Sequence, residues 1–442
     1  MSNSADISRR VALGIAAATA ATATATGAFG AKKSRDTGFL WGAATAAHQI
    51  EGGNWNSDYW ALEHIPATYF KEPSGDACDS FHRWREDLEL VRAGGMNSYR
   101  FSIEWARIEP EKGEFSRSAL NHYRTICITA REMGIEPVVT FHHFTSPRWI
   151  AAIGGWENPE TADHFARFCE VAAKALAGTF GWACTMNEPN AQVTSMVMAN
   201  GKLWDKQPTV LAQAAKAVNS DRFGAYFLGD AFKVRDVCLT AHAKARTAIK
   251  AAASGVKVGL TLALQQFVAG PGGDKLYKRV WDNTRLPFYQ LARDDDFIGV
   301  QTYNKGLIGP EGYLTSPNAV MLDAAQRDAS PGALAVVAQE AHRETRVPVF
   351  VTEHGMNAFD DAMRQRHLRA SLAELAKVID AGLPVLGYMH WSLLDNFEWT
   401  AGYEPRFGLV AVDQKTFQRT PKPSLSTYRR LIAELRASYR WA

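Results

Sequence analysis

The chain has 442 residues, of which 46% are hydrophobic, so it is long enough to bury a large core. Its 49 basic and 46 acidic residues give a net charge of +3, which excludes the strongly basic surface typical of nucleic-acid-binding proteins. The five cysteines are odd in number, scattered and without C-x-x-C spacing, which favours reduced, buried thiols over a disulfide framework or a zinc site.

Residues 1–31 differ from the rest of the chain and predict an export signal peptide. Arg9 and Arg10 precede a weakly hydrophobic stretch of Ala, Thr and Gly, residues 11–28, which ends in small residues. The arginine pair and the low hydrophobicity resemble a twin-arginine signal, although Ala12 stands where such signals usually have Phe. We therefore expect a bacterial protein that is periplasmic or secreted. A disordered Ala/Thr-rich tail is the alternative.

Residues 36–442 predict a single domain without a membrane span, because their apolar runs are only as long as strands. These runs are continuously hydrophobic, which favours strands buried on both faces of a parallel sheet. The predicted strands are 39–46, 97–103, 136–142, 182–187, 257–265, 296–303, 348–352 and 385–391. Amphipathic patterns predict helices over 80–93, 118–133, 160–177, 232–252 and 364–380.

Eight such repeats indicate an α/β fold, a single closed (β/α)8 TIM barrel. An open doubly wound sheet would instead need a G-x-G-x-x-G loop after its first strand, and the glycines there have the wrong spacing.

Polar and aromatic residues follow the carboxyl ends of seven of the eight predicted strands, where barrels of this type carry their chemistry. Packing of the core alone does not explain so many such groups at one rim. Glu188 and Glu353 each follow an apolar strand, and a pair of carboxylates is what glycoside hydrolysis needs. The residues at the rim are Gln49, Arg100, His142, His143, Asn187, Glu188, Gln301, Tyr303, Glu353, Trp391, Glu398 and Trp399.

Five segments, in order, resemble glycoside hydrolase family 1, the family of β-glucosidases and β-galactosidases. The likeness extends from Phe39 to about Pro423, and it implies a hydrolase that needs no metal or other cofactor. The segments are Phe39–Thr45 with Gln49–Gly52, Tyr99–Ile103, Thr185–Asn190, Thr352–Gly355, and Gly387–Trp399 with Arg406–Leu409.

The resemblance implies different roles for the two glutamates. Glu353 would be the nucleophile that forms a covalent glycosyl-enzyme intermediate, and Glu188 the acid and then the base, with carboxyls about 5–5.5 Å apart. Arg100 and Tyr303 would keep Glu353 ionised, and His354 would support it from behind through a hydrogen bond rather than touch the substrate. Glu188, which has fewer compensating partners, would carry the proton.

The resemblance also implies a site for the nonreducing sugar. Trp391 and Trp399 would form its apolar walls, and the peptide bond between Trp391 and Ser392 would be cis. A carboxylate at Glu398 would repel phosphate, which indicates an unphosphorylated sugar. Hydroxyl groups of the sugar would be bound by Gln49, His143, Asn187, Tyr303 and Glu398.

The sequence departs from the family pattern in four places. Phe144 and Thr145 stand where the family commonly has Trp-Asp, and Gln301-Thr302 where it has Asn-Tyr. His354 replaces the common Asn after the nucleophile. The segment between the fifth and sixth strands, residues 266–295, is short, which predicts a more open entrance that accepts bulky or hydrophobic aglycones.

We therefore expect a retaining exo-β-glycosidase, foremost a β-glucosidase, that acts on a β-linked glycoside or a short oligosaccharide. Glucose, galactose and fucose remain open as its sugar, and the oligomeric state remains open as well. A transglycosidase would use the same two glutamates and is one alternative. The other is a noncatalytic sugar-binding protein, against which the presence of Glu188, Glu353, Arg100 and Tyr303 argues.

Overall fold

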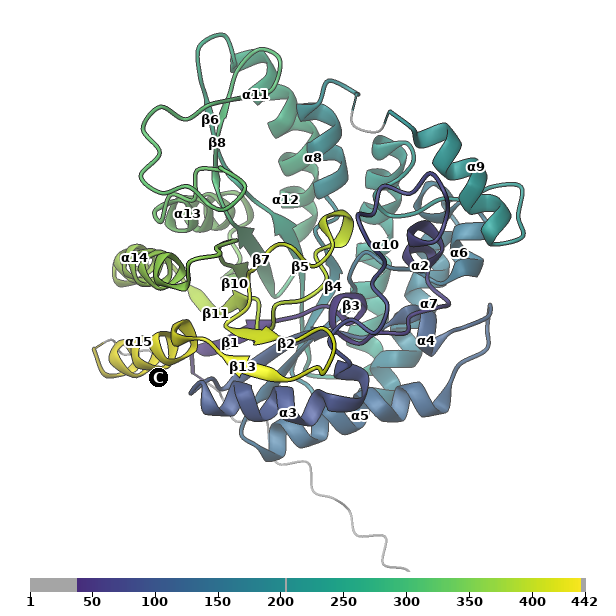
Figure 1. Cartoon of the computed structure of the whole chain (residues 1–442), viewed down its shortest axis with the longest axis horizontal. Coiled ribbons are helices and arrows are strands. Elements are labelled where there is room, and N and C mark those ends of the chain that lie inside the picture. Colours follow the sequence, from purple (N-terminus) through teal and green to yellow (C-terminus); the bar gives the residue numbers. More distant parts are fainter. Residues whose placement is uncertain (1–37, 203–204, 439–442) are drawn as a thin grey trace, which may run out of the picture. The chain divides into compact units, whose positions relative to one another are not determined.

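A computed structural model describes residues 38–202 and 205–438 of the chain, and the predicted signal peptide lies outside them. The described part contains a closed barrel of parallel strands in the order β1-β11-β10-β7-β5-β4-β3-β2, surrounded by helices (Figure 1). The prediction of a single (β/α)8 barrel is thereby confirmed. The barrel strands are β1 Leu40–Ala44, β2 Ser98–Ser102, β3 Glu136–His142, β4 Trp182–Asn187, β5 Lys257–Ala263, β7 Phe297–Thr302, β10 Val349–His354 and β11 Val385–Trp391.

The long helices cover the outside of the barrel, and three of those described begin after a capping side chain. Asp360 accepts a hydrogen bond from the backbone N–H of Ala362, so the helix predicted from residue 364 begins three residues earlier. Ser116 and Asp230 cap two other helices in the same way. The longer helices are α3 Ser80–Ala93, α5 Arg117–Glu132, α7 Thr161–Leu176, α10 Ala231–Ala252, α13 Ala333–Thr345, α14 Asp361–Asp380 and α15 Pro423–Ser438.

Shorter elements lie in the connections between strands and helices. The segment between β5 and β7 contains a strand and two helices joined by a π-helical turn, Trp281–Arg285. The shorter elements of all the connections are α1 Ala47–Ile50, α2 Asp58–Glu63, α4 Trp105–Ile108, α6 Arg148–Ala152, α8 Ala191–Met198, α9 Gln207–Ala217, α11 Asp274–Val280, α12 Leu286–Ala292, β6 Gln266–Ala269, β8 Lys305–Ile308, β9 Tyr313–Leu314, β12 Val410–Val412 and β13 Arg419–Pro421, with two 3-10 turns, Gly155–Glu157 and Trp399–Ala401.

Large apolar side chains fill the barrel near the amino ends of its strands. Trp182, Phe297 and Phe350 contact one another with ring centroids 5.4 to 5.6 Å apart. Gly42 allows close packing, since a Cβ there would lie 2.4 Å from the backbone oxygen of Ser98. Inside the barrel, this packing leaves room for a functional site at the carboxyl ends of the strands.

All five cysteines are buried and unpaired, which confirms the expectation of reduced thiols. Among the described residues, no helix is both long and apolar enough to cross a membrane.

Candidate active site

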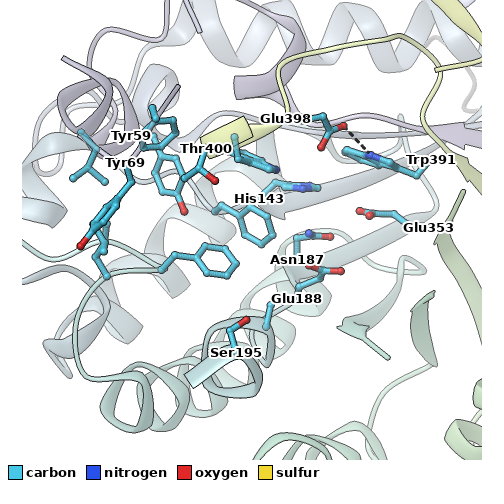
Figure 2. A pocket seen from close by; sticks show the side chains of 18 of the residues that line it. Tyr59, Tyr69, His143, Asn187, Glu188, Ser195, Glu353, Trp391, Glu398 and Thr400 are labelled. Carbon is cyan, nitrogen blue, oxygen red and sulfur yellow. Dashed lines mark hydrogen bonds between the residues drawn. The ribbon is translucent and has the colours of Figure 1, made fainter. Parts of the chain in front are cut away.

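A cavity of about 410 Å³ opens at the carboxyl ends of the barrel strands (Figure 2). Figure 2 shows Glu188, Glu353, Trp391 and Glu398 gathered at one end of it, with Tyr59 and Tyr69 toward the other. The cavity is lined by residues from most of the strand ends and from the loops that follow them. They are Tyr59, Leu62, Tyr69, Phe70, His143, Phe144, Asn187, Glu188, Ala191, Ser195, Ala225, Phe227, Leu228, Tyr303, Arg327, Glu353, Trp391, Glu398, Trp399, Thr400 and Phe407.

The Glu353 carboxylate accepts three hydrogen bonds. Arg100 Nη1 donates to Oε1 at 2.6 Å, and Gln301 Nε2 donates to the same oxygen at 3.0 Å. The Tyr303 hydroxyl donates to Oε2 at 2.5 Å. Burial raises the pKa of Glu353, but Arg100 and these hydrogen bonds oppose the rise. The pKa of Glu353 stays above its usual value, but these donors compensate its negative charge directly.

Arg100 also holds Asn187. Its Nη2 donates to Asn187 Oδ1 at 2.7 Å, and Gln301 Nε2 donates to the same oxygen at 2.7 Å. With its oxygen engaged by these two donors, Asn187 presents its amide nitrogen as the group available to a ligand in the cavity. The side chains of Arg100 and Gln301 thus connect Asn187 to Glu353.

Glu188 follows β4 directly, and the described residues provide it with no such set of donors. Its backbone lies in the left-handed region with φ of 46°, which directs the chain away from a right-handed helix at Pro189. Desolvation and the negative charge of Glu353 raise the pKa of Glu188 well above its usual value, and Arg100 only partly opposes them. The surroundings therefore favour a protonated carboxyl at Glu188.

Aromatic rings and a third carboxyl group form one end of the cavity. The ring of His143 lies 5.7 Å from that of Trp391 and 6.0 Å from that of Trp399, stacked with both. Trp391 Nε1 donates to Glu398 at 3.3 Å (Figure 2), and desolvation raises the pKa of Glu398 to about 8. The peptide bond between Trp391 and Ser392 is cis, as the family resemblance implied.

Two candidate residues lie behind the cavity wall. Gln49 is buried and donates to the backbone oxygen of Phe397 at 2.7 Å, while its side-chain oxygen has no partner among the described residues. His354 faces away from the nucleophile position, because its Nδ1 lies 2.8 Å from the Tyr388 hydroxyl and its ring stacks with His367 at 5.0 Å. No hydrogen bond of the described residues joins the His354 side chain to Glu353.

The structure places further residues in the site, beyond those predicted from sequence. Gln301 was noted at a strand end, yet its position between Asn187 and Glu353 is visible only in three dimensions. Arg327 is the one Lys or Arg among the described lining residues, and it pairs with Asp323 at 2.7 Å between Nε and Oδ2. Segments 59–70 and 225–228 contribute aromatic side chains to the cavity wall, and neither segment has a periodic sequence pattern.

In the described ranges, no group of three or more His, Cys, Asp or Glu side chains is arranged to hold a metal ion. The cavity holds two buried carboxyl groups in different surroundings, since donors surround Glu353 whereas desolvation and the charge of Glu353 raise the pKa of Glu188 well above its usual value.

Comparisons with known proteins identify the family of the chain. The sequence profile described as Glycosyl hydrolase family 1 matches residues 31–276 and 322–436. β-Glucosidase A of Thermotoga maritima is 30% identical over 451 residues, covering 89% of this chain and 97% of its own. A bifunctional β-D-glucosidase/β-D-fucosidase of Bifidobacterium breve is 28% identical, covering 90% of this chain and 98% of its own.

Solved structures show the same fold over the same range. The crystal structure of β-glycosidase BGL167 has 42% sequence identity and a TM-score of 0.86, covering 90% of this chain and 96% of its own. The Thermotoga maritima β-glucosidase in complex with glucoimidazole has 28% identity and a TM-score of 0.77, covering 90% of this chain and 98% of its own. The chain belongs to glycosyl hydrolase family 1 and is a glycoside hydrolase related to β-glucosidases.

Proposed function

We propose that the protein is a retaining exo-β-glycosidase, foremost a β-glucosidase, with Glu353 as nucleophile and Glu188 as acid and base. The observation that carries this proposal is the contrast between the two carboxyl groups. Arg100, Gln301 and Tyr303 donate to Glu353, whereas desolvation and the neighbouring charge raise the pKa of Glu188. Two carboxyls whose pKa values are pushed apart are suited to opposite roles.

The reaction would proceed in two displacements. An oxygen of Glu353 attacks the anomeric carbon and forms an ester bond, while the bond to the aglycone oxygen breaks and Glu188 gives that oxygen its proton. Water then enters, Glu188 takes a proton from it, and the resulting hydroxide attacks the anomeric carbon and releases Glu353. Two inversions return the sugar with its original β configuration.

The nonreducing sugar would occupy the end of the cavity that contains Trp391 and Glu398. Asn187 and His143 line this space and supply polar groups, and the unpartnered side-chain oxygen of Gln49 would accept a hydrogen bond from a sugar hydroxyl at its edge. A phosphorylated sugar fits poorly, because Arg327 is the one Lys or Arg in the described lining and is already paired with Asp323. Ionised Glu398 would add repulsion only above a pH of about 8.

The rest of the cavity favours a bulky or hydrophobic aglycone. Figure 2 shows aromatic rings along the wall away from the carboxyl groups. Burying the apolar surface of an aglycone there would stabilise its complex by about 25 cal/mol for each Å² removed from water. The residues of this aglycone side are Tyr59, Leu62, Tyr69, Phe70, Phe144, Phe227 and Leu228.

A panel of nitrophenyl glycosides that differ in sugar and anomer tests the proposal. We expect hydrolysis of the β-glucoside with β-glucose as first product, and faster cleavage of aryl β-glucosides than of cellobiose. An α-glucose first product would exclude the retaining mechanism, and cellobiose cleaved far faster than any aryl glucoside would exclude the aglycone preference. Glycosides formed from an added alcohol would identify a transglycosidase, and binding without turnover a noncatalytic protein.

We also propose that the protein is exported through a signal within residues 1–31, since Arg9 and Arg10 precede a weakly hydrophobic stretch. Amino-terminal sequencing of protein from the source cell tests this. A mature chain that begins before about residue 28 would exclude it.

A further inference from the structure

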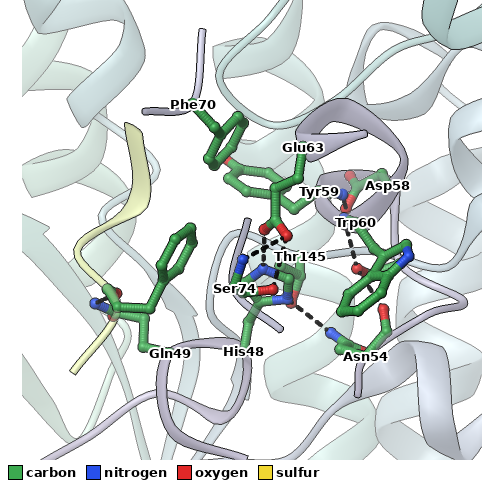
Figure 3. A network of polar contacts seen from close by, with 12 residues as sticks. His48, Gln49, Asn54, Asp58, Tyr59, Trp60, Glu63, Phe70, Ser74 and Thr145 are labelled. Atoms are coloured by element: carbon green, nitrogen blue, oxygen red, sulfur yellow. Dashed lines mark hydrogen bonds and ion pairs between the residues drawn. The ribbon is translucent and has the colours of Figure 1, made fainter. Parts of the chain in front are cut away.

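A network of buried polar contacts lies beside the cavity and takes no part in the proposed chemistry (Figure 3). His48 in α1 and Glu63 in α2 form its centre, with 2.7 Å between Nε2 and Oε1, and both side chains are fully buried. The Asn54 side-chain nitrogen lies 3.0 Å from His48 Nδ1. Because an amide nitrogen can only donate, His48 Nδ1 accepts, and the proton on Nε2 is donated to Glu63.

The other oxygen of Glu63 connects this network to a loop of the cavity wall. Glu63 Oε2 accepts hydrogen bonds from the Ser74 backbone at 2.9 Å and from the Ser74 hydroxyl at 2.7 Å. Burial raises the pKa of Glu63, but His48 and Ser74 outweigh this effect and hold the pKa below its usual value. Glu63 is therefore a fully partnered, ionised group that ties α1 to the segment before α3.

The ring of His48 faces the cavity wall from behind. It lies parallel to the indole of Trp399, with 3° between the planes and 5.8 Å between the centroids. Its edges are packed between Tyr59 at 5.9 Å and Phe397 at 6.0 Å. Hydrogen bonds at both ring nitrogens prevent the imidazole from rotating, so the plane against which Trp399 packs is fixed.

Trp399 needs such support. Its φ of 52° places a bulky residue in the left-handed region, which costs free energy and persists only where the surroundings hold it. Trp399 also lines the cavity at the end proposed for the sugar, and it stacks with His143 across that end. Its position therefore affects the shape of the sugar site directly.

We propose that the His48–Glu63 pair is a positioning device that holds Trp399 in the plane required for sugar binding. The inference rests on the proposed function in one respect, that Trp399 contacts the sugar. Stability alone is a weak explanation of the pair, because a buried carboxylate with its hydrogen-bond partner is often no more stabilising than apolar side chains of similar volume. Neither His48 nor Glu63 touches a reacting group, so the pair acts on binding rather than on proton transfer.

The variant His48→Phe separates stacking from positioning, because phenylalanine keeps a ring beside Trp399 and loses both hydrogen bonds. We expect KM for nitrophenyl β-glucoside and the inhibition constant of glucose to rise about tenfold, which corresponds to about 1.4 kcal/mol of binding free energy. We expect kcat to change less than about threefold and the pH profile of kcat to be unchanged, since the carboxyl pair is untouched.

The double variant His48→Phe/Glu63→Leu leaves no buried charge without a partner, so it should recover stability that His48→Phe loses. If the inference is right, KM stays raised in the double variant although the melting temperature recovers. A KM that returns to the wild-type value together with stability would show that the pair is only structural, and so would an unchanged KM in His48→Phe.

His242 offers a matched control elsewhere in the barrel. Its Nε2 lies 3.0 Å from Asp295 and its Nδ1 2.7 Å from the Thr185 hydroxyl, and His242 and Asp295 are fully buried. His242→Phe should lower the melting temperature and leave KM unchanged.

A wild-type protein that cleaves no β-glycoside would refute the proposed function, and calorimetry of glucose binding would then still test the role of the His48–Glu63 pair. Turnover with an unaltered KM and glucose affinity in His48→Phe would refute the positioning role alone.

Discussion

Arg100 donates a hydrogen bond of 2.6 Å to Glu353, and both side chains are almost entirely inaccessible to solvent. The same guanidinium donates to Asn187 at 2.7 Å. One cation, reaching across the barrel from β2, therefore holds the proposed nucleophile and a proposed sugar-binding amide at a fixed spacing. The two functions depend on a single side chain whose planar fork of donors allows both contacts.

The variant Arg100→Met should lose activity and stability together. It leaves Glu353 buried without its cation, and breaking a buried pair in this way costs about 3–5 kcal/mol of stability. The proposed nucleophile becomes harder to ionise, so kcat should fall by about 100-fold or more, as it does when a preorganised charge is removed from an active site. Steady-state kinetics and urea unfolding measure the two effects.

Arg100→Lys is the matched control, because it keeps the charge but cannot reach Glu353 and Asn187 with two arms. Arg100→Lys should recover part of the lost kcat, but little of the substrate affinity that KM reflects. Wild-type kinetics in Arg100→Met would contradict the assigned role of the arginine.

The two glutamates should respond differently to azide. Glu353→Ala should be nearly inactive, and azide in the vacated space should attack an activated glycoside directly and yield the α-glycosyl azide. Glu188→Ala keeps the nucleophile, so azide should instead attack the glycosyl-enzyme and yield the β-glycosyl azide. NMR of the products distinguishes the anomers. The same anomer from both variants would contradict the assignment.

The pH dependence of kcat/KM should reflect the raised pKa of Glu188. Its protonated form is the acid, so activity falls as the pH rises through that pKa. A dinitrophenyl leaving group needs no proton, so with this substrate Glu188→Gln should keep activity through the first displacement and lose the alkaline decline. A decline that persists unchanged in Glu188→Gln would assign it to another group.

The barrel strands could be predicted from sequence because each is buried on both faces and therefore reads as an uninterrupted apolar run. The predicted strand 182–187 agrees with β4, and 257–265 extends only two residues beyond β5. The small sheet of β6, β8 and β9 could not be predicted, because strands of two to four residues carry no periodic pattern. Its pairing depends on tertiary contacts between segments distant in sequence.

The carboxyl pair of the candidate site could be predicted from its position at the carboxyl ends of two strands, but the surroundings of the pair could not. Gln301 shares two acceptors with Arg100, and nothing in its neighbouring residues indicates this. The wall formed by Tyr59, Phe70 and Phe227 unites loops that have no common pattern. His354 was expected to support Glu353 through a hydrogen bond, whereas the His354 ring packs with Tyr388 and His367.

Gly355 follows the proposed nucleophile strand and cannot accept a side chain. A Cβ there would lie 1.9 Å from the backbone oxygen of Trp391, and backbone cannot move aside as a flexible side chain can. Gly355→Ala should therefore cost about 1–3 kcal/mol of stability and lower kcat/KM by displacing β10 from Trp391. Gly332→Ala is the control, since a Cβ at Gly332 meets nothing within 4 Å. Equal melting temperatures for the two variants would contradict the packing argument.

Glu398 should make the stability of the protein depend on pH. Its pKa is about 8 in the folded chain, against 4.5 for an ordinary glutamate, so the folded state holds the proton more tightly than the unfolded state. The stabilisation that Glu398 contributes to the folded state is complete below a pH of about 4.5 and is lost as the pH rises toward 8, with a slope of at most about 1.4 kcal/mol per pH unit.

The variant Glu398→Gln tests this dependence, because glutamine does not titrate. The difference in unfolding free energy between this variant and the wild type should therefore shift in favour of the variant from pH 5 to pH 8. Contributions of Glu188 and other buried acids are present in both proteins and largely cancel in the difference. Urea unfolding at several pH values measures this difference in unfolding free energy. A difference that does not vary with pH would show that Glu398 is ionised over the whole range from pH 5 to pH 8.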